Sequence, residues 1–112
     1  MSTSTNAVNA VFRALSDPTR RRVIERLGQS AASVNELAAP FDMALPSFVQ
    51  HLSVLESCGL VRSKKIGRVR TYRLAPQRLK LVEHWLEKQR SLWERRLEQL
   101  DVYLITLTEQ SQ

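Results

Sequence analysis

The sequence predicts a mainly α-helical fold with one small β-hairpin, on three observations. Apolar residues recur at helical spacing over most of the chain, whereas residues 60–74 alternate with a period of two. Residues 77–109 contain neither Gly nor Pro, which predicts one long helix near the end. We therefore expect a disordered tail over residues 1–6, a compact domain over residues 7–75 and a C-terminal helix over residues 76–112.

Two helices are predicted at the start of the domain. The first spans residues 7–15, where apolar side chains are spaced i, i+3, i+4 and i+7. The second begins after Asp17, a good N-cap, has Pro18 in its first turn and ends at Gly28. Its exposed arginines are either solvated or in contact with phosphates or acidic side chains; they are Arg20, Arg21, Arg22 and Arg26.

A helix-turn-helix is predicted next. Ser33 and Glu36 form a capping box that starts a short third helix, which stops near Pro40. Residues 42–44 make the turn, and a fourth helix runs from Pro46 to just before Gly59. A short capped helix, a tight turn and a second helix are typical of this motif.

The fourth helix has two different faces. Its apolar stripe consists of Leu45, Phe48, Leu52 and Leu55. The opposite face is small and uncharged, with Ser47, Gln50, Ser53, Val54 and Ser57. Such a face suits the major groove of DNA, although an ordinary amphipathic helix is the alternative interpretation. We expect the residues that read bases to be Ser47, Val49, Gln50 and Ser53.

Residues 60–65 and 69–74 predict two strands joined by a turn over residues 66–68. The hairpin carries six basic residues and no acidic one. A basic hairpin directly after a helix-turn-helix predicts a winged helix-turn-helix whose wing binds phosphates or a minor groove. The alternative is a solvated edge hairpin protected by lysines. The expected DNA-backbone residues are Arg62, Lys64, Lys65, Arg68 and Arg70.

The C-terminal helix carries a long stripe of leucines and two tryptophans. At 1.5 Å per residue it would reach roughly 50 Å, which is more than the domain needs. An exposed stripe of this kind would promote aggregation, so we expect it to pack on a second copy with the first helix beside it. The predicted homodimer interface is Val8, Val11, Phe12, Leu86, Trp93, Leu97, Leu100 and Leu104.

The charge is unevenly distributed. The chain has a formal net charge of +6, and all of it lies in residues 1–75, which hold eleven Lys or Arg and five Asp or Glu. This indicates a polyanionic partner, and charge alone does not separate DNA from RNA or an anionic membrane surface.

No apolar run approaches the ~20 residues of a membrane span, and the N-terminus has no signal pattern. With a single cysteine, Cys58, the chain is expected to be cytoplasmic.

Three segments resemble the arsenic-repressor-type (ArsR) winged-helix regulators. They are Phe12-Arg-Ala-Leu-Ser-Asp-Pro-Thr-Arg, Val34-Asn-Glu-Leu-Ala and Pro46-Ser-Phe-Val-Gln-His-Leu-Ser-Val-Leu-Glu-Ser-Cys-Gly-Leu-Val-Arg. The resemblance covers residues 8–105 and implies a homodimeric repressor that binds an inverted repeat. It also places His51 near a phosphate. Ala44 and Val49 stand where the family often has Ser, so Asp42 or a bound phosphate would satisfy the helix start, and Val49 would touch a thymine methyl.

The metal sites known in the family are not expected here. The stretch Glu36-Leu-Ala-Ala-Pro has no thiol where one family site needs Cys-x-Cys. His84 and Glu87 match half of another site, but Thr71 and Arg73 cannot supply the other half. We expect no metal and no cofactor. Cys58 is interpreted as a half-buried filler, with an oxidisable thiolate near Arg62 as the alternative.

The sequence therefore predicts a sequence-specific DNA-binding transcriptional regulator, a dimeric repressor on an inverted-repeat operator. The alternative is a winged-helix module that binds another protein and touches DNA weakly and without sequence preference. An enzyme is not expected, because no catalytic constellation can be assembled from the two distant histidines. The sequence does not identify the effector.

Overall fold

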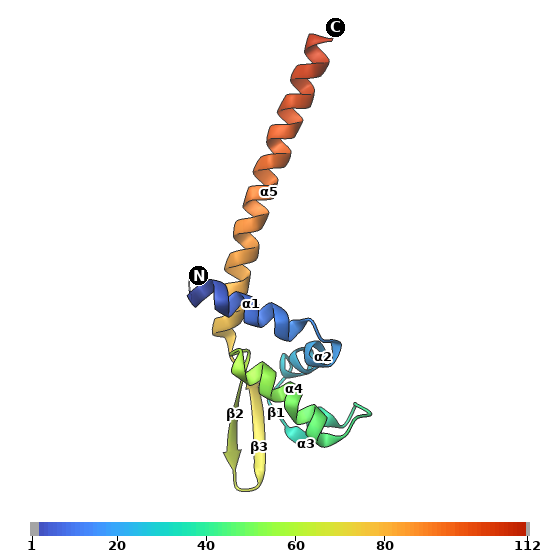
Figure 1. Cartoon of the computed structure of the whole chain (residues 1–112), viewed down its shortest axis with the longest axis vertical. Helices are drawn as coiled ribbons and strands as arrows, with labels where there is room; N and C mark the ends of the chain where they lie inside the picture. The colour runs from blue at the N-terminus through green and yellow to red at the C-terminus, as the bar shows by residue number, and fades with distance from the viewer. Residues whose placement is uncertain (1–2, 112) are drawn as a thin grey trace. The chain divides into compact units, whose positions relative to one another are not determined.

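The computed structural model describes residues 3–111, with side chains described from residue 5. The chain divides into two compact units, Met1–Val82 and Glu83–Gln112. The elements are α1 (Thr3–Leu15), α2 (Pro18–Leu27), β1 (Ala32–Ser33), α3 (Val34–Ala38), α4 (Leu45–Ser57), β2 (Val61–Ile66), β3 (Val69–Leu74) and α5 (Pro76–Gln110) (Figure 1). The predicted fold class is confirmed, since the chain is mainly helical with one small antiparallel sheet.

The first two helices follow the local signals, with one difference. The helix α1 begins at Thr3, so residues 3–6 are helical although a disordered tail over 1–6 was expected; Met1 and Ser2 lie outside the described residues. The helix α2 has Asp17 as its N-cap, where a carboxylate oxygen accepts from the Arg20 backbone N–H at 3.0 Å. Pro18 occupies its first turn, as predicted.

The helix-turn-helix consists of α3 and α4. The predicted capping box is present, with Ser33 and Glu36 each bonded to the other's backbone N–H at 3.2 Å. Hydrogen bonds from Ser33 lower the pKa of Glu36. The helix α4 begins after Ala44, and no side-chain hydrogen bond caps it. After its last turn Gly59 has a φ of +84°, the left-handed conformation that favours glycine.

The predicted hairpin belongs to a three-stranded sheet in the order β1-β3-β2. The strands β2 and β3 pair antiparallel from Val61 opposite Leu74 to Ile66 opposite Val69. A two-residue turn joins them, in which Gly67 has a φ of +61°, as the first central residue of a type II′ turn requires. The strand β1 was not predicted, because a two-residue strand is too short to show a period.

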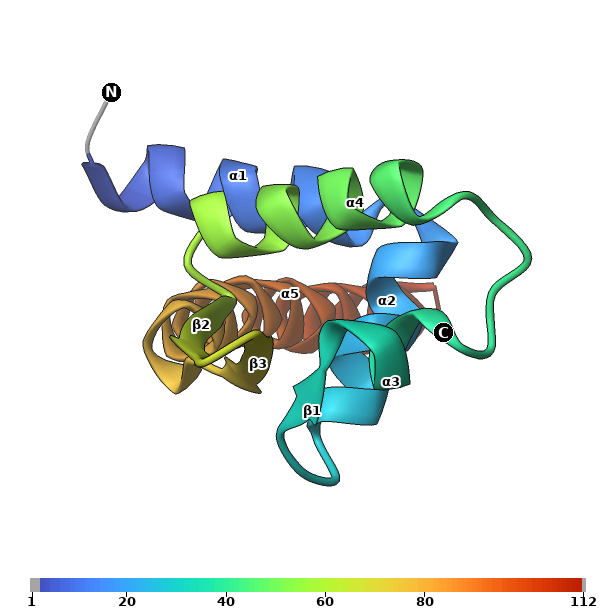
Figure 2. The ribbon, with the colours of Figure 1, turned by 90° about the horizontal axis from the view of Figure 1, so that it is seen from below.

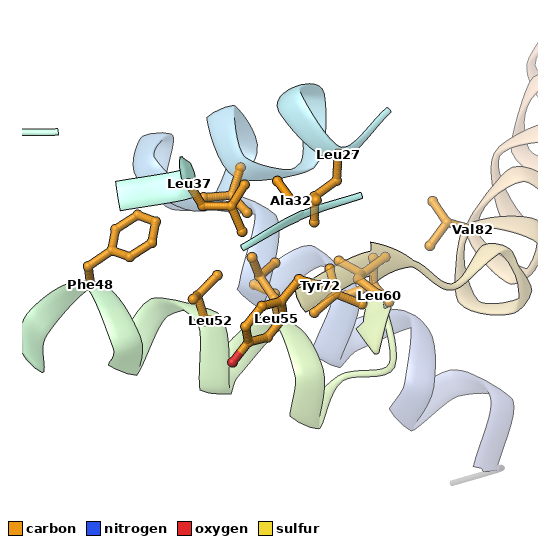
Figure 3. Close-up of a cluster of buried hydrophobic side chains, with 13 residues drawn as sticks. Leu27, Ala32, Leu37, Phe48, Leu52, Leu55, Leu60, Tyr72 and Val82 are labelled. Carbon is orange, nitrogen blue, oxygen red and sulfur yellow. The ribbon is translucent and has the colours of Figure 1, made fainter. Parts of the chain in front are cut away.

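The core of the first unit forms around α4 (Figure 3). Phe48, Leu52 and Leu55 have no exposed surface, and burying each contributes about 1.5–3 kcal/mol. In Figure 2, α4 runs beside α1, and it also packs on α2, α3 and β2. Leu45 is 48% exposed, so the predicted apolar stripe is one residue too long at its N-terminal end. The core is completed by Val11, Ala14, Val23, Leu27, Ala32, Leu37, Leu60, Val61, Tyr72 and Val82.

Two residues predicted for the homodimer interface are buried within the chain itself. Val8 is 7% exposed and Val11 is 0% exposed. One turn of α1 separates these two valines, so they share the face that turns into the chain, and neither has surface to offer a partner. Phe12, one turn after Val8, lies at the edge of that face and is 40% exposed.

Replacing Gly59 by Ala should lower the free energy of unfolding more than replacing Gly67 by Ala. A positive φ costs an L-residue about 1–2 kcal/mol at either position. At Gly59 the added Cβ would also lie 2.7 Å from Cγ of Arg78, whereas at Gly67 nothing lies within 4 Å. Urea unfolding of both variants measures the difference. Adding Arg78→Ala should remove the excess at Gly59, and equal losses in the two single variants would contradict this explanation.

Candidate nucleic-acid interface

The residues predicted to read bases lie on the surface of the first unit. Ser47, Gln50 and Ser53 are exposed, and Val49 is 38% exposed. The buried side chains between them, Phe48 and Leu52, hold the opposite side of α4 in the core. The helix therefore cannot turn this predicted base-reading face inward without exposing its largest apolar residues.

A groove of about 520 Å³ lies between α4 and the hairpin of β2 and β3, which we call the wing. Val49 and Ser53 line it from α4. Lys65, Arg68 and Arg70 line it from the wing. The structure thus brings two of the predicted base-reading residues together with three of the predicted phosphate-binding residues. The other residues of the lining are Val34, Glu56 and Tyr72.

The remaining two predicted wing cations do not line this groove. The β2–β3 register places Lys65 and Arg70 on the same face as Tyr72, while Arg62 and Lys64 project from the other face. Arg62 lies at the base of the wing, where its Nη2 donates to Oε1 of Gln77 at 3.4 Å. The basic residues of the wing therefore form two surfaces, because side chains alternate along each strand.

The wing is fastened to α4 by a chain of polar groups that the sequence did not indicate. The Ser63 hydroxyl donates to Oε2 of Glu56 at 2.6 Å and accepts from Nη1 of Arg70 at 2.8 Å. The pKa of Tyr72 beside them is raised, mainly by burial and then by the Glu56 carboxylate. No local pattern reveals this chain, since it joins a helix to the two strands that follow it.

His51 was predicted to lie near a DNA phosphate, and the structure shows what surrounds it in the chain. Its Nδ1 lies 3.1 Å from Nη1 of Arg20 and 3.7 Å from Oδ2 of Asp17. Arg20 is itself held by the Ala14 carbonyl, which accepts from its Nε at 2.6 Å. His51 is half-buried and links α4 to the start of α2. The sequence left the role of the four α2 arginines undecided. For Arg20, the structure shows a contact that joins α2 to α4.

Arg13 is a basic residue near the reading face that was not predicted. It lines a shallow groove between α1 and α4 together with Ser53 and Ser57. Ser53 therefore belongs to two grooves, one lined by Arg13 and the other by the wing cations. A basic residue in the last turn of α1 was the available signal.

Cys58 is a half-buried thiol at the end of α4, as its interpretation as a filler predicted. Its Sγ donates to the Leu55 carbonyl at 3.3 Å. Burial raises the pKa of Cys58, although nearby backbone N–H groups and the charges of Arg20 and Arg78 oppose this. The direction of this shift favours the filler interpretation, and Arg62 is not among the charges that act on the thiol.

Within residues 3–111, no group of three or more His, Cys, Asp or Glu side chains is placed to hold a metal ion. In the same range, no helix is both long and apolar enough to cross a membrane.

Comparisons with known proteins agree with this geometry. Residues 15–64 match the family model described as a helix-turn-helix domain. A solved ArsR family transcriptional regulator is 49% identical and superposes with a TM-score of 0.79, covering 84% of this chain and 97% of its own. An ArsR-like regulator from Rhodococcus sp. RHA1 is 33% identical with a TM-score of 0.75, covering 88% and 93%.

Curated relatives point the same way. The regulator Rv2034 of Mycobacterium tuberculosis is 36% identical over 77% of this chain and 78% of its own. The repressor SdpR of Bacillus subtilis is 29% identical over 70% and 88%. The chain belongs to the ArsR family and is a DNA-binding transcriptional regulator. Its relatives are named transcriptional regulators, and two of them are named repressors. The comparisons therefore support repression as the activity of this chain.

The Asp17 carboxylate that caps α2 and faces His51 should make stability depend on pH. Burial raises the pKa of Asp17, but the Arg20 N–H and the charges of His51 and Arg20 outweigh it, so the pKa lies below its ordinary value of 3.8. A lowered folded pKa contributes stability above the unfolded pKa that is lost as pH falls through the folded one. The stability advantage of the wild type over Asp17→Asn should therefore be full at neutral pH and shrink below about pH 4.

Urea unfolding at a series of pH values measures this difference. Asp17→Asn is the matched variant, since Asn also caps helices well. Asp17→Ala removes the helix cap, so its free energy of unfolding should be about 1 kcal/mol lower than that of Asp17→Asn at every pH. A difference between wild type and Asp17→Asn that stays constant down to pH 3 would show that the charge contributes nothing.

Proposed function

We propose that the chain is a dimeric repressor that binds an inverted-repeat operator, with α4 in the major groove and the wing beside it. The observation that supports this most is the pairing of an exposed, uncharged helix face with a cationic groove wall in one compact unit. An α-helix fits the ~12 Å width of the major groove, where each base pair presents a distinct pattern of donors and acceptors.

Each side chain has a separate role in this proposal. Ser47, Gln50 and Ser53 hydrogen-bond to base edges, and Val49 contacts a thymine methyl. Lys65, Arg68 and Arg70 bind phosphates or enter a minor groove. A phosphate also meets the uncapped start of α4. Arg62 and Lys64 add positive potential from the outer face of the wing. His51 supports the backbone contacts through Arg20, which it holds beside α4.

The second unit supplies the dimer contact in this proposal. Leu86, Trp93, Leu97, Leu100 and Leu104 are 49–64% exposed. They recur on one face of α5, and an apolar stripe of this size marks an interaction surface. Phe12 joins the interface from α1. Residues 76–112 serve as the dimerisation helix and residues 7–75 as the DNA-binding domain.

The rest of the proposal concerns chemistry and location. In this proposal the chain acts without a metal or a cofactor. It also acts without catalytic activity, which is supported by relatives that are transcriptional regulators. A cytoplasmic location follows from its target, since a regulator must reach the DNA that it controls.

Selection of bound duplexes from a random pool tests the function directly. The purified chain should enrich an inverted repeat whose half-site centres lie roughly 34 Å apart, one helical turn, because a two-fold dimer places two α4 helices in successive major grooves. Salt-sensitive binding without enrichment would instead support the protein-binding module.

The dimer contact can be tested in the same assay. Leu97→Glu should convert a sedimenting dimer to a monomer and abolish enrichment of the repeat. Gln99→Glu places the same side chain on the opposite face of α5 and should leave the dimer intact. A Leu97→Glu dimer that binds normally would overturn this interface.

Gln50→Ala and Lys65→Gln should affect DNA binding in different ways. Loss of Gln50 should relax preference at one base pair by about 1–3 kcal/mol, the value of a bidentate contact. Loss of Lys65 should weaken all sequences alike and reduce the salt slope by about 0.9 for each bound subunit. Lys88→Gln, outside the groove, is the matched control. If Gln50→Ala weakened every duplex equally, the reading face would be assigned wrongly.

A further inference from the structure

One carboxylate stands among the cations of the groove between α4 and the wing. Of the residues that line this groove, three are basic and Glu56 alone is acidic. An acidic side chain here repels DNA phosphates and so weakens binding, which indicates that Glu56 has a structural role in the groove. Its contacts indicate what that role is.

The contacts of Glu56 lead through Ser63 to Arg70. Ser63 uses its single hydroxyl both as donor to Glu56, at 2.6 Å, and as acceptor from Arg70, at 2.8 Å. No direct ion pair joins Glu56 and Arg70 within 4.0 Å among the described residues, so the hydroxyl is the bridge. Both ends of this chain are charged, and such hydrogen bonds are stronger than neutral ones.

The position of the chain links the two parts of the interface. Glu56 lies one helical turn after Ser53 on α4, and Arg70 follows the turn of the wing. The base of the wing is held in the core by Val61 and Tyr72. Nearer the tip, Ile66 and Val69 beside the turn are 68% and 54% exposed. The Glu56–Ser63–Arg70 chain therefore adds a polar link between α4 and the middle of the wing, beyond its buried base.

We infer that Glu56 is a positioning residue for DNA recognition: through Ser63 it holds Arg70 and the wing at a set distance from the reading face of α4. The inference rests on the proposed contacts of α4 and the wing with DNA. It makes Glu56 and Ser63 determinants of specificity without contact to a base. Held in this way, Arg70 approaches DNA only where α4 is seated in the groove, which favours the operator over other sequences.

Removing the carboxylate should therefore raise affinity and lower discrimination together. In Glu56→Ala, Arg70 is free to neutralise any phosphate, so random duplex should bind more tightly and the salt slope should steepen by about 0.9 for each bound subunit. The ratio of operator to random affinity should fall roughly tenfold, the loss expected for one hydrogen bond to a charged group. Glu25→Ala removes the same charge from the exposed surface of α2 and should change neither quantity.

Ser63→Ala separates position from charge. It breaks the bridge but keeps the carboxylate beside Arg70, so discrimination should fall while the salt slope stays unchanged. The double variant should match Glu56→Ala, because both changes break one chain. Affinities for the selected duplex and a random duplex, each at several salt concentrations, supply every readout. If Glu56→Ala does not fold, Ser63→Ala, which removes one oxygen, decides the question through the discrimination ratio.

Three outcomes would overturn the inference. Discrimination that survives both Glu56→Ala and Ser63→Ala would leave the chain with a purely structural part. A loss confined to one base pair in Glu56→Ala, with Ser63→Ala unaffected, would make Glu56 a base-reading residue. A wild-type chain that does not prefer the selected duplex would overturn the proposed function as well, whereas the first two outcomes leave that function standing.

Discussion

Burial of one face of α4 is the constraint on which the rest of the first unit depends. Phe48, Leu52 and Leu55 are completely enclosed, and they touch a core that draws on every other element of the unit. Because a helix has one apolar stripe, fixing this face also fixes the opposite one. The exposure of Ser47, Gln50 and Ser53 is therefore a consequence of packing. The free energy that folds the domain also orients the face that we propose reads bases.

In the proposed complex, the charged groups beside that face contribute separately to affinity and to sequence selection. In the proposed complex, phosphates are attracted to Lys65, Arg68 and Arg70 in any sequence, so this attraction provides affinity without selection. Selection depends on the distance between those cations and the bases that α4 meets. In the inferred arrangement Glu56 serves both demands, since its carboxylate lowers general affinity and, through Ser63, holds Arg70 in place. Lower affinity for all DNA together with higher selectivity suits a regulator that must find one site among many.

The two ends of the chain show how an apolar pattern can serve two purposes. Val8 and Val11 carry the spacing expected of an interface, yet both are buried within the chain itself. The leucines and Trp93 of the second unit carry a similar spacing and remain exposed. Periodicity reports that a face is apolar, and only the packed chain shows whether its own residues already cover it. The exposed apolar face of α5 is open to the proposed homodimer, whereas Val8 and Val11 are already covered by the chain itself.

The sequence by itself determined the features that depend on neighbours along the chain. Asp17 as a cap, the Ser33–Glu36 box, the left-handed Gly59 and the bounds of α5 all follow from interactions within a few residues. The helix-turn-helix motif and its family were also visible at that level. Only the tertiary structure decided the strand β1, the exposure of Leu45, the His51–Arg20 contact and the Glu56–Ser63–Arg70 chain. These features join separate elements, and their distances are set by how the core packs, which no local pattern encodes.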